Sequence, residues 1–249
     1  MNIIAIIPAR YASTRLPAKP LVDICGKTMI QRVYEQTKKS KLITDVIVAT
    51  DDERIVSAVQ AFGGNAQMTP VHIHSGSDRI ALIAKPLHAD IVVNVQGDEP
   101  LIDPLLIDQT IQALIDDTSA VVSTAVKKTM SHQDVFNPNV VKVVLDNNRF
   151  ALYFSRSPIP HMRDAKKDSD WFNGTVFYKH FGIYVYRADF LQKYTSLPQT
   201  ALEHAEKLEQ LRILEHGYKI KCVVTEYESV PVDTPEDLER VRTIIKGIS

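Results

Sequence analysis

The stretch that decides the fold is Asn2–Leu21, NIIAIIPARYASTRLPAKPL. Its apolar start predicts a β-strand over residues 2–7, which runs directly into a loop with three cations, Arg10, Arg15 and Lys19. In open α/β sheets, ligands bind beyond the carboxyl ends of the strands. Fixed cations at that position suit a ligand with several negative charges, such as a triphosphate.

The composition of this loop bears on the same interpretation. Small residues that let backbone amides approach an anion are Ala9, Ala12 and Ser13. Three prolines stiffen the segment and lower the entropy cost of holding the charges in place: Pro8, Pro17 and Pro20. The loop has no glycine, so it is not a P-loop. The alternative is that the cations are simply solvated at the surface.

Length and charge bound the class of protein. At ~150 residues per domain, 249 residues indicate a single α/β domain over residues 1–249 with an insertion or lid around residues 130–190. Lys+Arg 29 against Asp+Glu 30 gives a net charge of −1, which favours neither nucleic acid nor a membrane surface. The sequence shows no leader and no long apolar run, so we expect no membrane insertion and a cytoplasmic location. Cys25 and Cys222 are far apart and predict reduced thiols.

Strand-like and helix-like segments alternate through the first half of the chain. Strands are predicted at residues 2–7, 45–49, 89–95 and 120–126, and helices at residues 29–38, 52–61, 77–84 and 104–115. The nearly uninterrupted apolar run at residues 90–95 is typical of a central parallel strand. The pattern predicts an α/β fold with a doubly wound, mostly parallel sheet.

The second half is less regular. Further strands are predicted at residues 140–145, 150–154, 180–187 and 219–225, and helices at 188–194 and 203–216. Residues 158–177 indicate a long loop that contains Trp171, and such loops are more often lids or interface elements than fillers. A final helix opens at Thr234 as N-cap, followed by Pro235.

Two aspartates are candidates for a metal site. Asp98 follows the most apolar strand, beside Gly97, where a carboxylate is well placed for Mg²⁺; the alternative is a turn residue that caps its own backbone. Asp233 immediately precedes the last helix, and its alternative role is to complement the helix dipole. Gln96, at the same strand end as Asp98, can hydrogen-bond ligand hydroxyls or a base edge.

Two polar clusters follow other predicted strands and helices. Thr50 and Asp51 close the second strand, and Asp52 opens the next helix, so helix capping is the favoured interpretation from sequence alone. In the second cluster, Ser75 and Arg79 flank Ser77, which we predict to be an N-cap. No GxSxG elbow or Cys/His pair indicates a protein nucleophile.

Candidate sugar-binding groups lie in the second half. Glu209 has Ala205 and Ile213 four residues away on either side, so on the predicted helix it lies along an apolar strip; its alternative role is an ion pair with Arg212. His180 and Tyr184 are four apart on a predicted strand and therefore share one face, where ordinary half-buried packing is the alternative.

The run PARYASTRLPAKPL resembles the N-terminal signature of the 3-deoxy-manno-octulosonate (Kdo) cytidylyltransferases. The resemblance continues, in the same order and over nearly the whole chain, through VATDDERI, HSGSDRIA, VVNVQGDEP, FNPNVVKVVLD, ALYFSRSPIP, KHFGIYVYR, LEQLRILEHGYKI and VDTPEDLERV. Family members commonly have Gly, Asn and Thr where Ala18, Cys25 and Ser77 stand. Ala18 implies either that this position needs no positive φ or that it tolerates one at a cost.

The resemblance implies a fold, a reaction and a set of site residues. The fold is like that of the nucleotide-diphospho-sugar transferases, with an inserted smaller region for sugar binding and dimerisation. The reaction transfers CMP from CTP to the anomeric hydroxyl of Kdo and releases pyrophosphate, for lipopolysaccharide synthesis by a cytoplasmic homodimer. Mg²⁺ is the implied cofactor, held by Asp98 and Asp233.

The implied site has three parts. The catalytic residues are Arg10, Arg15, Lys19, Asp98 and Asp233. The nucleotide-binding residues are Ala9, Arg10, Lys19, Thr50, Asp51, Ser75, Arg79 and Gln96. The sugar-binding residues are Arg15, Gln96, Arg156, His180, Tyr184, Glu209 and Gln210.

Two other functions stay open at this stage. One is a cytidylyltransferase for a related acidic sugar, such as 8-amino Kdo or a sialic acid. Turnover measured side by side with each candidate sugar distinguishes this function from one with Kdo. The other is a non-catalytic nucleotide-binding protein, against which the joint presence of Arg10, Lys19, Asp98 and Asp233 argues.

Overall fold

The computed structural model describes residues 1–12, 15–73, 75–172 and 174–248; Ser13, one of the small loop residues named above, lies outside them. The chain divides into two compact units. Unit 1 comprises Met1–Asp108, Val185–Thr195 and Ser229–Ser249, and unit 2 comprises Gln109–Tyr184 and Ser196–Glu228. None of the helices in the described part of the chain combines the length and hydropathy that a bilayer crossing requires.

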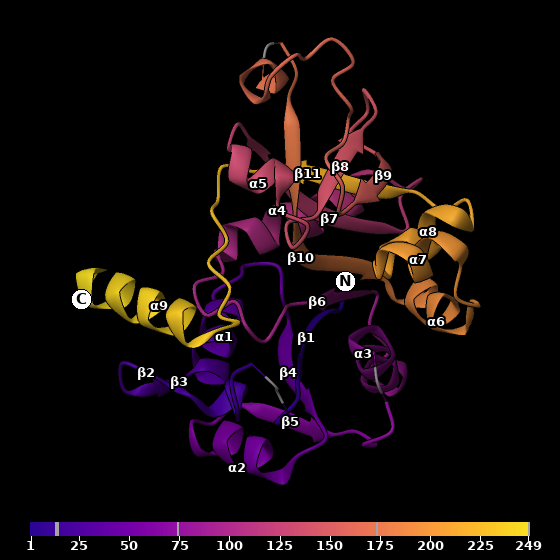
Figure 1. Ribbon diagram of the computed structural model, residues 1–249. Coiled ribbons are helices and arrows are strands. Elements are labelled where there is room, and N and C mark those ends of the chain that lie inside the picture. The colour runs from indigo at the N-terminus through magenta and orange to yellow at the C-terminus, as the bar shows by residue number, and fades with distance from the viewer. Residues whose placement is uncertain (13–14, 74, 173, 249) are drawn as a thin grey trace. The chain divides into compact units, whose positions relative to one another are not determined.

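Unit 1 is built on four neighbouring parallel strands, in the order β6 (Ile91–Asn94), β1 (Ile3–Ala9), β4 (Asp45–Thr50) and β5 (Asn65–Met68) (Figure 1). Nearly all side chains of the first three strands are buried. Continuous apolar runs suit such strands because both faces of a parallel sheet are covered. The carboxyl ends of β1, β4 and β6 therefore meet at one edge of the sheet.

Unit 1 also contains several helices. They are α1 (Met29–Thr37), α2 (Glu53–Ala61), α3 (Gly76–Ala84), most of α6 (Ala188–Ser196) and α9 (Pro235–Ile248), together with the 3₁₀ turns η1 (Lys19–Leu21) and η2 (Lys85–Leu87). α3 packs against β1, and α2 packs against β4 and β5. A small hairpin of β2 (Asp23–Ile24) and β3 (Lys27–Thr28) precedes α1.

Unit 2 contains β11 (Ile220–Val224), β7 (Val122–Thr129) and most of β10 (Phe177–Arg187) as neighbouring strands, with β11 parallel to β7. β8 (Lys142–Leu145) pairs antiparallel with both β10 and β9 (Ala151–Ser155). The helical segments of unit 2 are α5 (His132–Phe136), η3 (Asp168–Phe172), α7 (Ala201–Glu206), α8 (Gln210–Glu215) and most of α4 (Pro104–Asp116).

The predicted α/β class with a mostly parallel sheet is confirmed, and every predicted strand is present. Sequence reasoning missed the short strands β2, β3 and β5 and the one-turn helix α5. The prediction of one helix over residues 203–216 is wrong: Lys207 has a φ of 54°, and this left-handed residue separates α7 from α8. The single domain with an insertion around residues 130–190 stays a prediction.

Two further details bear on the sequence-based predictions. Ala18 has a φ of 53°, so this position requires the left-handed region that glycine adopts at no cost, and Ala18 tolerates it. Cys25 has the same φ. Cys25 and Cys222 are both free thiols, as predicted.

Candidate active site

A cleft of about 430 Å³ lies in unit 1, at the carboxyl ends of β1 and β6. Its lining combines cations, carboxylates and small residues: Pro8, Ala9, Arg10, Ala12, Arg15, Lys19, Pro20, Gly76, Arg79, Gln96, Gly97, Asp98 and Asp233. This is the sheet edge where ligands bind in open α/β folds. The cationic loop that follows β1 thus faces the two aspartates predicted to bind a metal.

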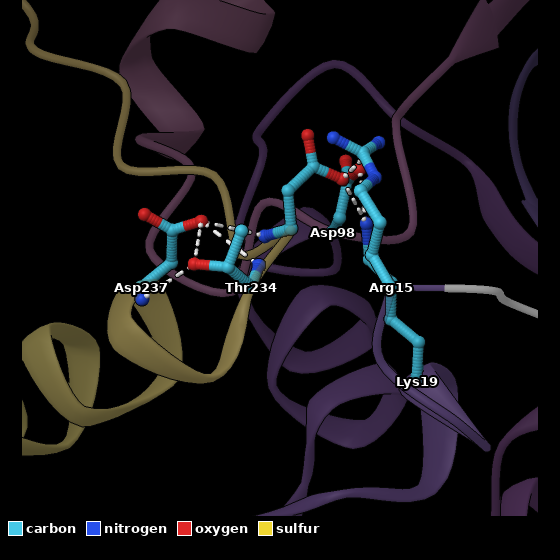
Figure 2. A network of polar contacts seen from close by, with 6 residues as sticks. Arg15, Lys19, Asp98, Thr234 and Asp237 are labelled. Atoms are coloured by element: carbon cyan, nitrogen blue, oxygen red, sulfur yellow. Dashed lines mark hydrogen bonds and ion pairs between the residues drawn. The ribbon is translucent and has the colours of Figure 1, made fainter.

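Lys19 is the centre of the charge arrangement in this cleft. Its Nζ donates to Asp98 Oδ2 at 2.7 Å and to Asp233 Oδ1 at 2.8 Å. Arg15 Nη2 donates to the same Asp233 oxygen at 3.0 Å. Figure 2 shows Arg15 and Lys19 reaching toward the carboxylates from the loop on one side, with Asp98 beside them.

The electrostatic state of Lys19 follows from these contacts. Burial lowers the pKa of Lys19, but the charges of Asp98 and Asp233 and the hydrogen bonds to them raise it more, so the net pKa lies above its ordinary value. Lys19 is therefore an ammonium throughout the physiological range. Only 16 % of its side chain is exposed, whereas Arg15 is 65 % exposed, so the Lys19 charge is the less screened of the two.

Asp233 is held by the start of α9. The hydroxyl of Thr234 accepts from the Asp237 backbone N–H at 3.2 Å, which confirms Thr234 as N-cap. The Asp237 carboxylate accepts in return from the N–H of Thr234 at 2.9 Å and from the N–H of Asp233 at 3.0 Å (Figure 2). This is a capping box extended by one residue. The cap therefore also fixes the backbone of Asp233.

A second pair of contacts joins the segments that carry Asp98 and Asp233. The backbone N–H of Val232 donates to the Asp98 carbonyl at 2.9 Å, and the hydroxyl of Ser229 donates to Glu99 Oε1. Glu99 Oε2 is buried and has no hydrogen-bond partner among the described residues. Burial is the main cause that raises the pKa of Glu99 to about 7. Sequence reasoning missed Glu99, although it directly follows Asp98.

Asp98 and Asp233 fit a divalent cation in type and in placement. Carboxylate oxygens are the ligands that Mg²⁺ prefers, and one cation, the Lys19 ammonium, already lies within hydrogen-bond distance of both groups. Among the described residues, no group of three or more His, Cys, Asp or Glu is arranged to hold a metal ion. The other ligands of a Mg²⁺ ion there would come from water and phosphate oxygens, which is its common mode in nucleotide sites.

Arg10 and Arg79 converge on one backbone carbonyl. Both guanidinium groups donate to the Ile73 oxygen. Arg79 is fully buried and also donates to the Thr69 hydroxyl and, at 2.7 Å, to Asp51 Oδ2. Arg79 thereby ties the end of β4 to the segment before α3, and it is among the residues that surround the cleft.

The remaining predicted nucleotide residues have local roles in the structure. Thr50 is buried, and its hydroxyl accepts from the Asp52 N–H at 3.3 Å. Asp52 caps α2, as the sequence favoured. The prediction that Ser77 caps the next helix is wrong: Ser75 is the N-cap of α3 and accepts from the Asp78 N–H at 3.1 Å, because its extended backbone starts the helix two residues earlier.

Gln96 and Gly97 form the floor of the cleft beside Asp98. Gln96 Nε2 donates to Asn94 Oδ1 at 3.2 Å. A Cβ atom added at Gly97 would lie 2.9 Å from the Pro8 carbonyl oxygen, so only glycine lets these two strand ends approach so closely. Gly76 and Gly97 were not predicted as site residues; the glycine directly before Asp98 was the available signal.

The predicted sugar residues all lie in unit 2, apart from Arg15 and Gln96. His180 and Tyr184 share one face of β10, with ring centroids 5.4 Å apart, as predicted. His180 Nε2 lies 2.8 Å from the Thr124 hydroxyl, which also lies 2.7 Å from the Ile183 carbonyl. Burial lowers the pKa of His180 to about 3, so the ring is neutral at physiological pH.

Arg156 lies at the end of β9 and reaches backbone carbonyls. Nε donates to the Glu206 oxygen at 2.7 Å, Nη1 to the Pro138 oxygen at 3.0 Å and Nη2 to the Lys207 oxygen at 3.5 Å. Each terminal nitrogen of an arginine carries a second N–H. The guanidinium therefore keeps donors for a ligand carboxylate while it holds the α7–α8 corner.

Glu209 and Gln210 lie at the start of α8, as its N-cap and first residue. The predicted apolar strip that includes Ala205 is wrong, because α7 ends at Glu206 and places Ala205 on a different helix. Arg212, the proposed alternative partner of Glu209, forms a buried ion pair with Glu203, with Nε 2.8 Å from Oε2.

Comparisons with known proteins give a consistent result. A family model described as "Cytidylyltransferase" matches residues 4–220. The 3-deoxy-manno-octulosonate cytidylyltransferase of Geotalea uraniireducens (strain Rf4) is 54 % identical over 250 residues, covering 99 % of this chain and 100 % of that protein. The protein of the same name from Geobacter sulfurreducens is 52 % identical over 250 residues, with 99 % and 100 % coverage.

Solved structures agree with the sequence matches. A CMP:2-keto-3-deoxy-manno-octonic acid synthetase complexed with CTP superposes with a TM-score of 0.93 at 44 % identity and covers 100 % of both chains. A 4-diphosphocytidyl-2C-methyl-D-erythritol synthase from Anaerococcus prevotii gives a TM-score of 0.65 at 16 % identity, covering 98 % of both chains. The match to the Anaerococcus prevotii structure shows a similar fold only.

Proposed function

Because the chain belongs to the 3-deoxy-manno-octulosonate cytidylyltransferase family, we propose that it transfers CMP from CTP to Kdo. The observation that carries this proposal is the arrangement of Lys19 between Asp98 and Asp233, in a cleft that Arg10 and Arg15 also line. Cations suit the triphosphate, and carboxylates suit the metal that accompanies it.

The proposed reaction is a direct displacement at phosphorus. The anomeric 2-hydroxyl oxygen of Kdo forms a bond to the α-phosphorus of CTP, the bond from this phosphorus to the bridging oxygen breaks, and pyrophosphate leaves with the electron pair. The hydroxyl proton passes to solvent. Nucleotidyl transfer asks little covalent chemistry of the protein, so positioning and charge neutralisation dominate.

The cleft residues have separate parts in this reaction. Asp98 and Asp233 would hold Mg²⁺, which when bound polarises the α-phosphate and orients the sugar hydroxyl. With the two carboxylates engaged in that way, the Lys19 ammonium would be free to pair with phosphate oxygens. Arg10 and Arg15 neutralise charge that builds on the phosphates. Ala9, Thr50, Asp51, Ser75, Arg79 and Gln96 complete the proposed nucleotide site.

The sugar is assigned to residues of unit 2. Arg156 faces the Kdo carboxylate with the donors that its backbone contacts leave. Neutral His180, with Tyr184, Glu209 and Gln210, hydrogen-bonds the hydroxyls. A carboxylate such as Glu209 also suits a terminal amine, so 8-amino Kdo is the second candidate substrate.

The central experiment measures pyrophosphate release from CTP with Kdo or 8-amino Kdo as acceptor. We expect Mg²⁺-dependent turnover in the unaltered protein and almost none in Asp98→Asn or Asp233→Asn, because each change keeps the shape and removes one anionic oxygen ligand. Substantial Mg²⁺-dependent turnover in both variants would remove these aspartates from the mechanism. The ratio of kcat/KM for the two sugars decides between the two substrates.

The family resemblance also supports the cellular context that we propose. The protein acts as a homodimer in the cytoplasm and supplies CMP-Kdo for lipopolysaccharide synthesis. Size-exclusion chromatography with light-scattering detection measures the mass of the protein in solution. A monomer at micromolar concentration would refute the dimer.

A further inference from the structure

Lys142, at the start of β8, is a lysine that is 0 % exposed. Its ammonium donates to three backbone carbonyls: that of Asn137 at 2.9 Å, that of Val140 at 2.6 Å and that of Arg156 at 2.6 Å. Burial of an ammonium is costly, and an apolar side chain would fill the space without that cost. We therefore attribute the role of the Lys142 ammonium to the hydrogen bonds that it donates to these three carbonyls.

Arg156 continues the network that starts at Lys142. Its carbonyl accepts from Lys142, and its guanidinium donates to the carbonyls of Pro138, Glu206 and Lys207. Together the two cations hold three separate segments: the loop at residues 137–140, the end of β9, and the corner between α7 and α8.

Glu206 supplies the only carboxylate among the described hydrogen-bond partners of Arg156. It accepts from the Arg156 backbone N–H at 2.9 Å and from the Ser155 hydroxyl at 2.6 Å. Its negative charge also partly offsets the lowering of the Lys142 pKa that burial causes. Lys142 is buried, whereas Arg156 and Glu206 are half-buried. The three charges are linked through shared hydrogen bonds, so the loss of one changes the balance of charge at the other two.

This network lies next to the residues that we assign to sugar binding. Lys207, whose carbonyl accepts from Arg156, is the left-handed residue that turns the chain from α7 into α8. Glu209 and Gln210 follow two and three residues later. A shift of this corner therefore moves the side chains assigned to the sugar, together with the Arg156 guanidinium.

We propose that Lys142 is a positioning residue for the acidic sugar substrate, acting through Arg156 and, with Glu206, through the α7–α8 corner. The inference rests on the proposed function, because it concerns the sugar side of that reaction. Lys142 itself does not touch the substrate. It sets where Arg156, Glu209 and Gln210 stand when the sugar arrives.

The test compares Lys142→Met with Lys128→Met in the full-length protein. Methionine keeps most of the stem of Lys142 and removes the charge, and Lys128 is an exposed lysine on β7 of the same unit. We expect KM for Kdo to rise by about tenfold or more in Lys142→Met, because misplacement of about 1 Å can cost two orders of magnitude. KM for CTP should stay within about twofold of the unaltered value, and Lys128→Met should change neither constant.

A second variant keeps the proposal testable if Lys142→Met does not fold. Glu206→Gln preserves size and removes the counter-charge, so we expect the same selective rise in KM for Kdo, to a smaller extent. An unchanged KM for Kdo in either folded variant, or equal rises for Kdo and CTP, would overturn the inference alone. Absence of turnover in the unaltered protein would overturn the proposed function and this inference with it.

Discussion

Replacement of Lys19 by methionine tests whether this ammonium holds the place of a metal cation. Lys19→Met keeps the aliphatic stem, which is mostly buried, and removes the charge that lies 2.7 Å from Asp98 and 2.8 Å from Asp233. Among the ion pairs of the described residues, Arg15 then remains on Asp233, and Asp98 keeps none.

The expected cost follows from the contacts that are lost. Two hydrogen bonds between charged groups are worth about 1.5–3 kcal/mol each. Asp98 is 28 % exposed and Asp233 is 37 % exposed, so water replaces part of this energy and about 2–4 kcal/mol remains. For a chain of this size, that lowers Tm by about 5–15 °C. The matched control is Lys27→Met, which breaks the more exposed Lys27–Glu35 pair and should cost about 1 kcal/mol or less.

The assay is thermal unfolding with and without Mg²⁺, in the absence of nucleotide. A ligand that binds only the folded state raises its stability, and in Lys19→Met the metal meets no competing ammonium. Mg²⁺ should therefore raise Tm more in Lys19→Met than in the unaltered protein. The raised pKa of Lys19 means that its stabilising contribution is complete below about pH 10.5 and is lost only as the pH rises through the folded-state pKa. The difference in stability between the two proteins should accordingly be the same at pH 7 and pH 9.

Two results would refute this reasoning. A Tm of Lys19→Met equal to that of Lys27→Met would mean that the buried contacts carry no more energy than a surface pair. A Mg²⁺ shift no larger in the variant than in the unaltered protein would mean that Lys19 does not compete with the metal. In turnover assays, Lys19→Ala should lower kcat more than it weakens CTP binding, and a pure rise in KM for CTP would contradict a role in the transition state.

Three further predictions concern other positions. Gly97→Ala should lower stability by about 1–3 kcal/mol and weaken CTP binding, because its Cβ would meet the Pro8 carbonyl at 2.9 Å, whereas Gly76→Ala meets only a Pro8 carbon at 3.7 Å and should be neutral; calorimetry that ranks them equally would contradict this. His180 should show no NMR titration between pH 5 and 8, because its pKa in the folded protein is about 3. Since the pKa of His180 is higher in the unfolded chain, lowering the pH protonates the unfolded state first, and the free energy of unfolding should drop by about 2 kcal/mol between neutral pH and pH 5. A His180→Gln variant should lack this pH dependence. Ala18→Gly should raise Tm by a few degrees, because it relieves the strain at a φ of 53°, and a lower Tm would show that the strain is absent.

Much of unit 1 could be predicted because its signals are local. The apolar runs of β1, β4 and β6 identify buried strands, and the charges that follow each strand mark the sheet edge where they meet. β5 was missed because Asn65–Met68 is short and only half-buried, so its sequence lacks a strand pattern. Asp98 and Lys19 were found because they lie in the loops that follow strands located by the pattern.

The rest depends on contacts between residues far apart in the sequence. The break at Lys207 has no glycine to signal it, so the continuous helical pattern around it predicted one helix. The burial of Lys142 is equally invisible, since a lysine in a sequence is expected at the surface. The Lys207 carbonyl accepts a hydrogen bond from the Arg156 side chain, and the Lys142 ammonium donates to the Arg156 carbonyl. Periodicity within one segment contains no information about such contacts.

The contact between Lys19 and Asp233 joins residues separated by 214 positions. Asp98 is synthesised long before Asp233, and at ~5–20 residues per second the ribosome needs roughly 7–27 seconds to cover the interval between them. Throughout that time the nascent chain has one carboxylate of the pair and the lysine, without the other carboxylate. The pair of aspartates that we propose for Mg²⁺ is therefore complete only after most of the chain has emerged.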